Sequence, residues 1–428
     1  MSKFFACMLS VLLLVAAAVP AMATDARQLA LANVGNFIED DFNIFTWYAT
    51  LPSYSNTVWI GLDYYYYGYY SGAKAAAAAD GAGYYGNFLG AAYGLGSDGK
   101  YGTLAMFFYS YGPPLGYDGY NWSNEYVFKY SVGNKWTLLY AYPLEKLSLG
   151  FYFSRSDGSS KQEDEEETTY ESALAYTSLG AGVRFDLGEK AYADLAFDYN
   201  LASQTERASS IYSIYYGYGD VTEDANSMMG FRGRMFYEWN ETITWVPYAS
   251  YRMYDFSLKA DSADWKDTYY GDKGMMFEFG LGANIKVNED NLIVFAIEPY
   301  GYYKYEPSDP PDNASAEATY TIFPAFALAL ESDIKDWLTL RTGAQKGFYK
   351  SKYESEETEG DETFKDIETY TGSWFDYYLG LGFHIGDFDI DMLVSPDLPF
   401  NIGYWLTGYQ GMEGYDAPVY KLTALYHF

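Results

Sequence analysis

The last nine residues of the chain, 420–428, alternate between two kinds of side chain with a period of two. One face of an extended strand there would carry Tyr420, Leu422, Ala424, Tyr426 and Phe428, and the other Lys421, Thr423 and His427, with Leu425 as the exception. Successive side chains of a strand point to opposite faces, so the pattern predicts a strand between two different environments. An apolar strand that ends at an aromatic C-terminus is unusual for a soluble protein, whose termini tend to fray.

The same alternation recurs from residue 57 onward. We predict an all-β chain of about sixteen strands, with fourteen or eighteen as alternatives, at 57–70, 85–95, 100–111, 123–142, 146–156, 170–186, 190–203, 226–239, 242–258, 274–287, 291–305, 318–332, 336–350, 371–385, 388–395 and 417–428. Gly133-Asn134 could divide strand 123–142. An even count with both termini in the periplasm favours one bulged strand there.

The connections between these strands alternate in length. Short turns are expected at 187–190, 240–242, 288–291, 333–336 and 386–389, and long polar loops at 157–169, 204–225, 259–273, 306–317, 351–370 and 396–416. A transmembrane antiparallel β-barrel has short periplasmic turns and long extracellular loops. A soluble secreted β-sandwich is the alternative, but it has no reason to alternate loop lengths in this way.

The composition agrees with a barrel. Aromatic residues make up 21% of the chain, and no apolar run long enough for a spanning helix follows residue 24. A chain of this kind enters a membrane only as a closed barrel, because backbone groups in lipid must be paired internally. The net charge of −31 argues against a nucleic-acid partner, whose phosphates are bound by Lys and Arg. The single cysteine, Cys7, leaves no disulfide in an exported chain.

The N-terminus has the features of a secretory signal peptide. Lys3 precedes an apolar core at 9–19, and Ala21 and Ala23 form an A-x-A cleavage site. The core is too short to span a membrane as a retained anchor. We therefore expect residues 1–23 to be removed.

The C-terminal strand resembles the signal of bacterial outer-membrane β-barrel proteins that the barrel-assembly machinery reads. The residues that carry the resemblance are Tyr420, Leu422, Tyr426 and Phe428. It implies a place in the cell outer membrane of a Gram-negative-type bacterium. The partners it implies are outer-membrane lipid, lipopolysaccharide and the assembly machinery.

Residues 24–52 lack clean alternation and form a separate N-terminal region before a barrel at 53–428. An Ala-Arg start at Ala26, an acidic pair at 40–41 and an aromatic stretch at 42–48 resemble the start of FadL-like and PorV-like outer-membrane proteins. Tyr48-Ala49-Thr50-Leu51 stands where those families have Asn-Pro-Ala-x-Leu, and the Asn and Pro are missing. The resemblance implies a plug in the lumen, and a periplasmic linker to the first strand is the alternative.

Charged residues on the less apolar strand faces are predicted to line the lumen, because Arg at the lipid midplane costs about 2–4 kcal/mol. They alternate with apolar positions, and in strand 291–305 they share a face with Tyr300 and Tyr302. They could select solutes by charge or pair with one another across strands. The predicted lining residues are Arg184, Asp194, Asp198, Arg232, Arg234, Glu238, Arg252, Glu278, Glu298, Arg341 and Asp376.

Residues for catalysis or cofactor binding are few. The two histidines, His384 and His427, fall near periplasmic strand ends, whereas outer-membrane proteases and phospholipases need theirs at the outer rim. The acidic clusters at 163–167 and 354–368 show no ordered ligand spacing, so they are either solvated loops or a divalent-cation bridge to lipopolysaccharide. We predict no enzyme activity, no metal and no cofactor.

These features predict an outer-membrane channel for passive passage of small molecules, with 24–52 as the plug. The sequence does not identify the solute. The alternative is a non-conducting surface structural or binding barrel that acts through its acidic, Tyr-rich loops.

Overall fold

The computed structural model describes residues 25–63, 88–109, 134–164, 167–208, 220–222, 226–261, 268–307, 314–359, 362–394 and 419–428. The predicted signal peptide, with Ala21 and Ala23, lies outside these residues, as does the predicted loop 396–416. Among the described residues, no helix is long and apolar enough to cross a membrane.

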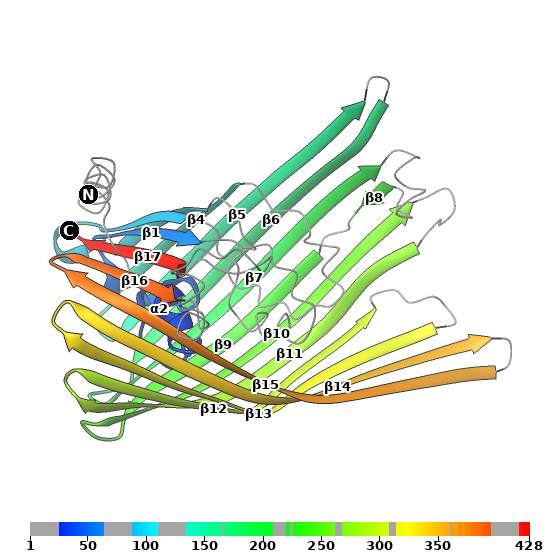
Figure 1. The fold of residues 1–428 in the computed structure, drawn as a ribbon. Helices are drawn as coiled ribbons and strands as arrows, with labels where there is room; N and C mark the ends of the chain where they lie inside the picture. The colour runs from blue at the N-terminus through cyan, green and yellow to red at the C-terminus, as the bar shows by residue number, and fades with distance from the viewer. Residues whose placement is uncertain are drawn as a thin grey trace, which may run out of the picture.

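The described chain forms one antiparallel sheet that closes on itself (Figure 1). Its strands are β1 (Thr57–Asp63), β2 (Phe88–Gly94), β3 (Thr103–Tyr109), β4 (Asn134–Pro143), β5 (Leu147–Asp164), β6 (Glu167–Asp186), β7 (Ala191–Ala208), β8 (Asp220–Thr222), β9 (Asn226–Glu238), β10 (Ile243–Asp261), β11 (Thr268–Asn288), β12 (Asn291–Pro307), β13 (Ala314–Lys335), β14 (Leu338–Glu359), β15 (Glu362–Ile385), β16 (Phe388–Val394) and β17 (Val419–His427).

The barrel has sixteen strand positions, which confirms the predicted count. β8 and β9 both pair with β7 and with β10, so they occupy one position in two pieces. β1 pairs with β17 from Thr57↔His427 to Asp63↔Lys421, and this pairing closes the ring. The five predicted short turns join β6 to β7, β9 to β10, β11 to β12, β13 to β14 and β15 to β16.

The two faces of the wall differ in the predicted way. Phe108, Phe151, Phe231 and Phe375 project outward and are each about half exposed or more. In β17, Lys421, Thr423 and Leu425 are buried on the inner face, whereas Phe428 is exposed. The side chain of Tyr420 lies outside the described part of the chain.

An apolar exterior on a closed sheet is the arrangement of a membrane-spanning barrel. Trp239 and Trp337 are exposed beside short turns, where an aromatic belt meets the membrane–water interface. Membrane-spanning antiparallel barrels with an even number of strands are typical of the outer membrane of Gram-negative-type bacteria. This chain is such an outer-membrane barrel.

A bulge in β12 corrects one predicted face. Ile297 lies opposite Leu281 but Tyr300 lies opposite Phe279, so β12 holds one extra residue there. A bulge shifts the alternation by one position. Tyr303 is therefore buried, while Tyr300 is exposed and does not share a face with Glu298 as predicted.

Most of the predicted long loops are wrong in extent. β5 and β6 stay paired to Asp164↔Glu167, and β14 and β15 to Glu359↔Glu362, across the segments predicted as loops 157–169 and 351–370. A strand needs only about 9–11 residues to span the bilayer. Outside the lipid both faces of a strand meet water, so polar sequence there does not end the pairing. Figure 1 shows these hairpins projecting from one end of the barrel.

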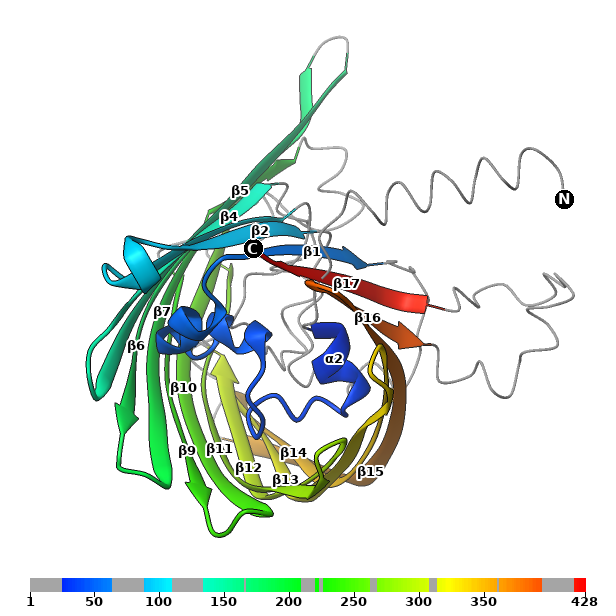
Figure 2. The same ribbon diagram turned by 90° about the vertical axis from the view of Figure 1, so that its left-hand side faces the viewer.

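The N-terminal segment, defined here as residues 25–56, lies inside the ring of strands (Figure 2). It contains a short helix, α2 (Asp25–Ala30), and two 3-10 helices, η1 (Asp41–Phe45) and η2 (Tyr48–Tyr54). α2 contacts β14 to β17, and η2 contacts β3 to β6 on the far side of the lumen. The segment thus crosses the barrel from wall to wall.

Candidate functional site

Aromatic side chains of the N-terminal segment pack against the inner wall. The ring of Phe45 meets that of Phe107 edge-on at 4.6 Å between centroids, and Tyr48 stacks on Tyr152 at 5.0 Å. These rings belong to one buried cluster that joins the segment to at least seven strands. The part of the lumen that the segment crosses is therefore a packed core and not an open pore.

Glycines on the inner wall make room for the segment's backbone. A Cβ at Gly150 would lie 2.3 Å from the carbonyl carbon of Tyr48, and one at Gly343 would lie 2.5 Å from the amide nitrogen of Ala32. Real Cβ contacts are not this short, so only glycine fits at these positions. The wall is shaped for the segment on two opposite sides.

Arg234 on β9 binds the turn between α2 and η1. Its Nη1 donates to the carbonyl oxygens of Gly35 at 3.2 Å, Asn36 at 3.3 Å and Ile38 at 3.0 Å. Its Nε donates to Asp194 at 3.0 Å, and Arg184 donates to the same carboxylate at 2.7 Å. The Asp194 carboxylate thus orients Arg234 toward the segment, consistent with a charge-assisted network.

A second network holds α2 to the opposite wall. Arg27 forms a two-pronged ion pair with Glu331 at 2.8 and 2.9 Å, and it also bonds Asp40 at 2.6 Å. Arg341 bonds both Glu331 and Asp391. Burial disfavours the charge of Arg27, but Glu331 and Asp40 outweigh that effect and raise its pKa well above the usual value.

The Asp41 carboxyl is buried in η1 and accepts a hydrogen bond from the indole Nε1 of Trp59 at 3.2 Å. Burial raises the pKa of Asp41 well above its usual value of 3.8, and the neighbouring Asp40 adds to the shift. Protonation of this carboxyl therefore favours the segment in its place inside the lumen, the state called docked below.

The predicted lining residues fall into three groups. Six are buried on the inner wall: Asp194, Asp198, Arg232, Arg234, Arg252 and Arg341. Arg184, Glu278, Glu298 and Asp376 are partly exposed, and Glu238 is exposed beside the short turn after β9. Arg232 pairs with Asp198, and Glu278 accepts hydrogen bonds from Ser250 and Tyr303, both at 2.7 Å.

Sequence reasoning missed Arg27, Glu331, Asp391 and Lys135. A signal was present for two of them. Asp391 alternates with Ile390 and Met392, and Glu331 follows the apolar strand positions 327–330. Arg27 carried no such signal, because its partner is 304 residues away.

The histidines form a network at the periplasmic end. His384 contacts Asp389 at 2.5 Å and Thr339 at 2.9 Å, and the Thr339 hydroxyl donates a hydrogen bond to Asp333. His427 lies beside Thr57 at 3.2 Å, at the seam of the ring.

The acidic clusters also lie in paired strands where the structure describes them. Glu354 on β14 pairs with Lys352 of the same strand and with Lys365 on β15. Within the described ranges, no group of three or more His, Cys, Asp or Glu side chains could hold a metal ion.

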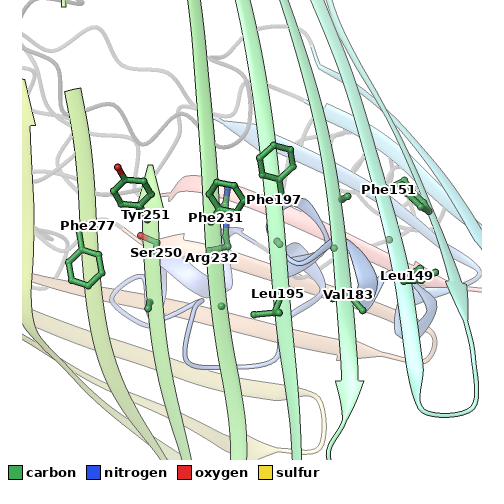
Figure 3. Close-up of a pocket in the computed structure, with 16 residues that line it drawn as sticks. Leu149, Phe151, Val183, Leu195, Phe197, Phe231, Arg232, Ser250, Tyr251 and Phe277 are labelled. Carbon is green, nitrogen blue, oxygen red and sulfur yellow. The ribbon is translucent and has the colours of Figure 1, made fainter. Parts of the chain in front are cut away.

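The outer wall carries an apolar groove of about 590 Å³ across β5 to β11 (Figure 3). Phe151 and Phe277 stand at its two ends, Phe231 lies between them, and the small residues Ala181 and Ala249 leave the hollow (Figure 3). The groove opens toward the lipid-facing side, away from the N-terminal segment.

Comparisons with known proteins do not identify a family. No family model and no curated protein matches the chain, so the predicted FadL-like or PorV-like resemblance is not shown. Solved structures that it matches include the ferric yersiniabactin uptake receptor FyuA from Yersinia pestis (11% identity, TM-score 0.41, 61% of this chain and 44% of that one). The alcaligin outer-membrane receptor FauA from Bordetella pertussis matches at 6% identity and a TM-score of 0.40, over 87% of this chain and 75% of that one.

The CymD monoaromatic hydrocarbon channel matches at 9% identity and a TM-score of 0.35, over 94% of this chain and 97% of that one. This chain spans less than half the length of FyuA. The identities and TM-scores are too low to assign an activity, and the barrel assignment rests on the strand pairing itself.

Proposed function

We propose that this protein is an outer-membrane channel for passive passage of small molecules, and that the N-terminal segment is its plug. The observation that carries the proposal is the fit of the segment across the lumen, where Arg234 binds three of its carbonyl oxygens. A barrel of sixteen strands has a lumen too wide for wall side chains alone to fill. A segment that fills it from one chain end can leave without breaking the wall.

A reversible cross-link tests this directly. The Cβ of Tyr48 lies 3.5 Å from the Cβ position of Gly182, close to the spacing of a disulfide. Cys7 is the chain's single cysteine and belongs to the predicted signal peptide, so Tyr48→Cys with Gly182→Cys would form a defined pair. We expect no conductance in planar bilayers when the pair is oxidised, and conductance after reduction.

The single variant Tyr48→Cys is the matched control, and its conductance should not respond to the oxidant. A second variant, lacking residues 25–54, should conduct permanently and pass labelled solutes into liposomes. If neither the reduced pair nor the shortened chain conducts or passes solute, the channel proposal is wrong.

A surface-binding barrel is the second candidate, and the projecting hairpins favour it. β14 and β15 have 22 and 24 residues, about twice the length needed to span a bilayer. This function predicts that trimming residues 157–169 and 351–370 abolishes binding of a partner or of calcium and leaves permeability unchanged. A change in permeability alone would assign the hairpins to the channel.

Neither proposed function involves a catalytic step or a cofactor, and calcium is a ligand only in the second. Outer-membrane lipid and lipopolysaccharide are the proposed partners of the outer wall, and an acyl chain suits the apolar groove between Phe151 and Phe277. Insertion by the barrel-assembly machinery through the C-terminal strand is part of the same proposal.

A further inference from the structure

Lys135 on β4 carries a buried amine for which the described residues provide no anion. Its side chain is 4% exposed and lies on the inner face with Thr137 and Leu139, opposite the exposed Leu138. Within the part of the chain that the structure describes, its Nζ has no hydrogen-bond partner, and its one recorded contact is the ring of Tyr109 at 5.0 Å. A buried ammonium is unfavourable without a partner, and an unpaired one within a membrane-spanning wall marks a candidate binding site.

The strand register places hydroxyl groups beside this lysine. Lys135 lies opposite Ser156 on β5, and the next inner row continues from Thr137 through Ser154 to Ser178 on β6. Thr137 donates to Ser154 at 3.0 Å, so that pair is satisfied. The hydroxyls of Ser156 and Ser178 are buried; that of Ser156 has no hydrogen-bond partner among the described residues, and that of Ser178 lies beside the hydroxyl of Tyr152.

The carboxylates of the adjoining inner wall are already engaged. Asp194 binds Arg184 and Arg234, and Asp198 binds Arg232 and Asn200. The chain as a whole carries a net charge of −31, so acids are abundant. No acid among the described residues pairs with Lys135, which leaves this position open to an anion from outside the polypeptide.

We propose that Lys135, Ser156 and Ser178 form a binding site for the oxyanion group, carboxylate or phosphate, of a small solute. An ammonium offers three donors and no acceptor, and each hydroxyl can donate one more bond, which suits an oxygen-rich anion and not a cation. The site adjoins Tyr152, on which Tyr48 of the N-terminal segment stacks. A bound solute would therefore lie next to that segment.

Binding to the folded barrel in detergent tests the site without requiring conduction. Sodium acetate and inorganic phosphate are titrated calorimetrically at fixed ionic strength, with sodium chloride as the reference salt. We expect at least one probe to bind the unaltered protein, and Lys135→Met to weaken that binding at least tenfold. Lys286→Met, at an exposed lysine near a short turn, is the matched control and should bind as the unaltered protein does.

A second variant guards against misfolding of the first. Ser156→Ala combined with Ser178→Ala retains the lysine and should weaken binding by about tenfold, with folding checked by heat-modifiability on a gel. The relative affinity for acetate and phosphate distinguishes the two oxyanions. The proposal is overturned if neither probe binds more tightly than chloride, or if Lys135→Met binds unchanged.

The site and the channel can fail separately. A protein that binds phosphate through Lys135 but never conducts would retain this site and lose the proposed function. A protein that conducts but binds neither probe would retain the proposed channel function and lose this site.

Discussion

Arg234 is the side chain on which the docking of the N-terminal segment most depends, because its guanidinium donates hydrogen bonds to three carbonyl oxygens of the segment and to the Asp194 carboxylate. Arg234→Met keeps much of the volume and removes all four bonds. Hydrogen bonds to charged groups contribute about 1.5–3 kcal/mol each, so docking should weaken by at least tenfold. Hydrogen exchange of residues 35–38, followed by mass spectrometry, measures the loss of protection.

Arg155→Met is the matched control for that variant. Arg155 lies on the outer face of β5, where it donates to Thr177 at 2.7 Å, away from the segment. Unchanged exchange in Arg234→Met, or equal loss in both variants, would show that the segment does not depend on Arg234.

Gly150 provides a steric test at the residue scale. A methyl group there would meet the Tyr48 backbone at 2.3 Å, so Gly150→Ala should displace η2 or lower the Tm of the barrel. Gly301→Ala is the control, since its nearest neighbour would lie at 3.5 Å, an ordinary contact. We expect increased proteolysis of the segment in Gly150→Ala only, and equal proteolysis in both variants would contradict the close approach.

Asp41 predicts that docking weakens as the pH rises. Below its usual pKa of 3.8 the carboxyl is protonated in both the docked and the free segment and favours neither. Above that value the free segment loses the proton while the docked one retains it, up to the raised pKa, so docking loses free energy across this window. Exchange protection of residues 41–45, corrected for the intrinsic rate, should therefore fall between pH 4 and the raised pKa.

Asp41→Asn is the matching variant, because an amide resembles the neutral acid in shape and cannot ionise. Its protection should be independent of pH across the same window and higher than that of the unaltered protein at neutral pH. A pH dependence that persists in Asp41→Asn would assign the titration to another group.

At the scale of elements, the wall is longer than the membrane requires. Replacing residues 353–368 with a two-residue turn removes the projecting end of β14–β15 and leaves at least fifteen residues in each strand. Because about 9–11 residues span the bilayer, we expect a folded, heat-modifiable barrel. The same replacement in the short strands β2 and β3 would serve no such test, since each has seven described residues.

The result would be read on a gel and in bilayers. A shortened protein that fails to fold would show that the projecting hairpin stabilises the barrel and is not an addition to it.

At the scale of the whole molecule, closure depends on β17. It pairs with β1 over seven register positions and with β16 over seven more, and Phe428 donates its amide to Asn56 at 3.0 Å. Deleting residues 419–428 opens two edges at once, and an open edge is not stable in lipid. We expect loss of the heat-modifiable band, whereas Phe428→Ala, which keeps the pairing, should retain it.

Much of the fold could be predicted because each strand position has a local cause. The alternation of Arg232 and Arg234 with Phe231 marks the two faces, and the short turns mark one end of the barrel. The long hairpins were missed because pairing outside the lipid does not require an apolar face. The bulge at Pro299 was missed because an inserted residue leaves the composition of a strand unchanged.

The candidate site was predictable only in part. Lumen charges such as Asp198 and Arg232 could be recognised from their strand faces, but their partners could not. Lys135 falls within the strand predicted at 123–142, yet its lack of an acceptor among the described residues depends on what lies across β5 and β6.

The sequence by itself determined a closed antiparallel barrel, its lipid-facing side and its C-terminal seam, because a period of two and the solvent on each face are local properties. Only the tertiary structure decided that the N-terminal segment lies in the lumen. Its contacts join residues as distant in sequence as Arg27 and Glu331. They also require glycines at 150 and 343, where the wall approaches the backbone of the segment, and the strand pattern does not predict this approach. Such contacts arise only once the ring has closed around the segment. The same holds for the buried amine of Lys135, because its burial and its lack of a partner among the described residues are properties of the assembled wall.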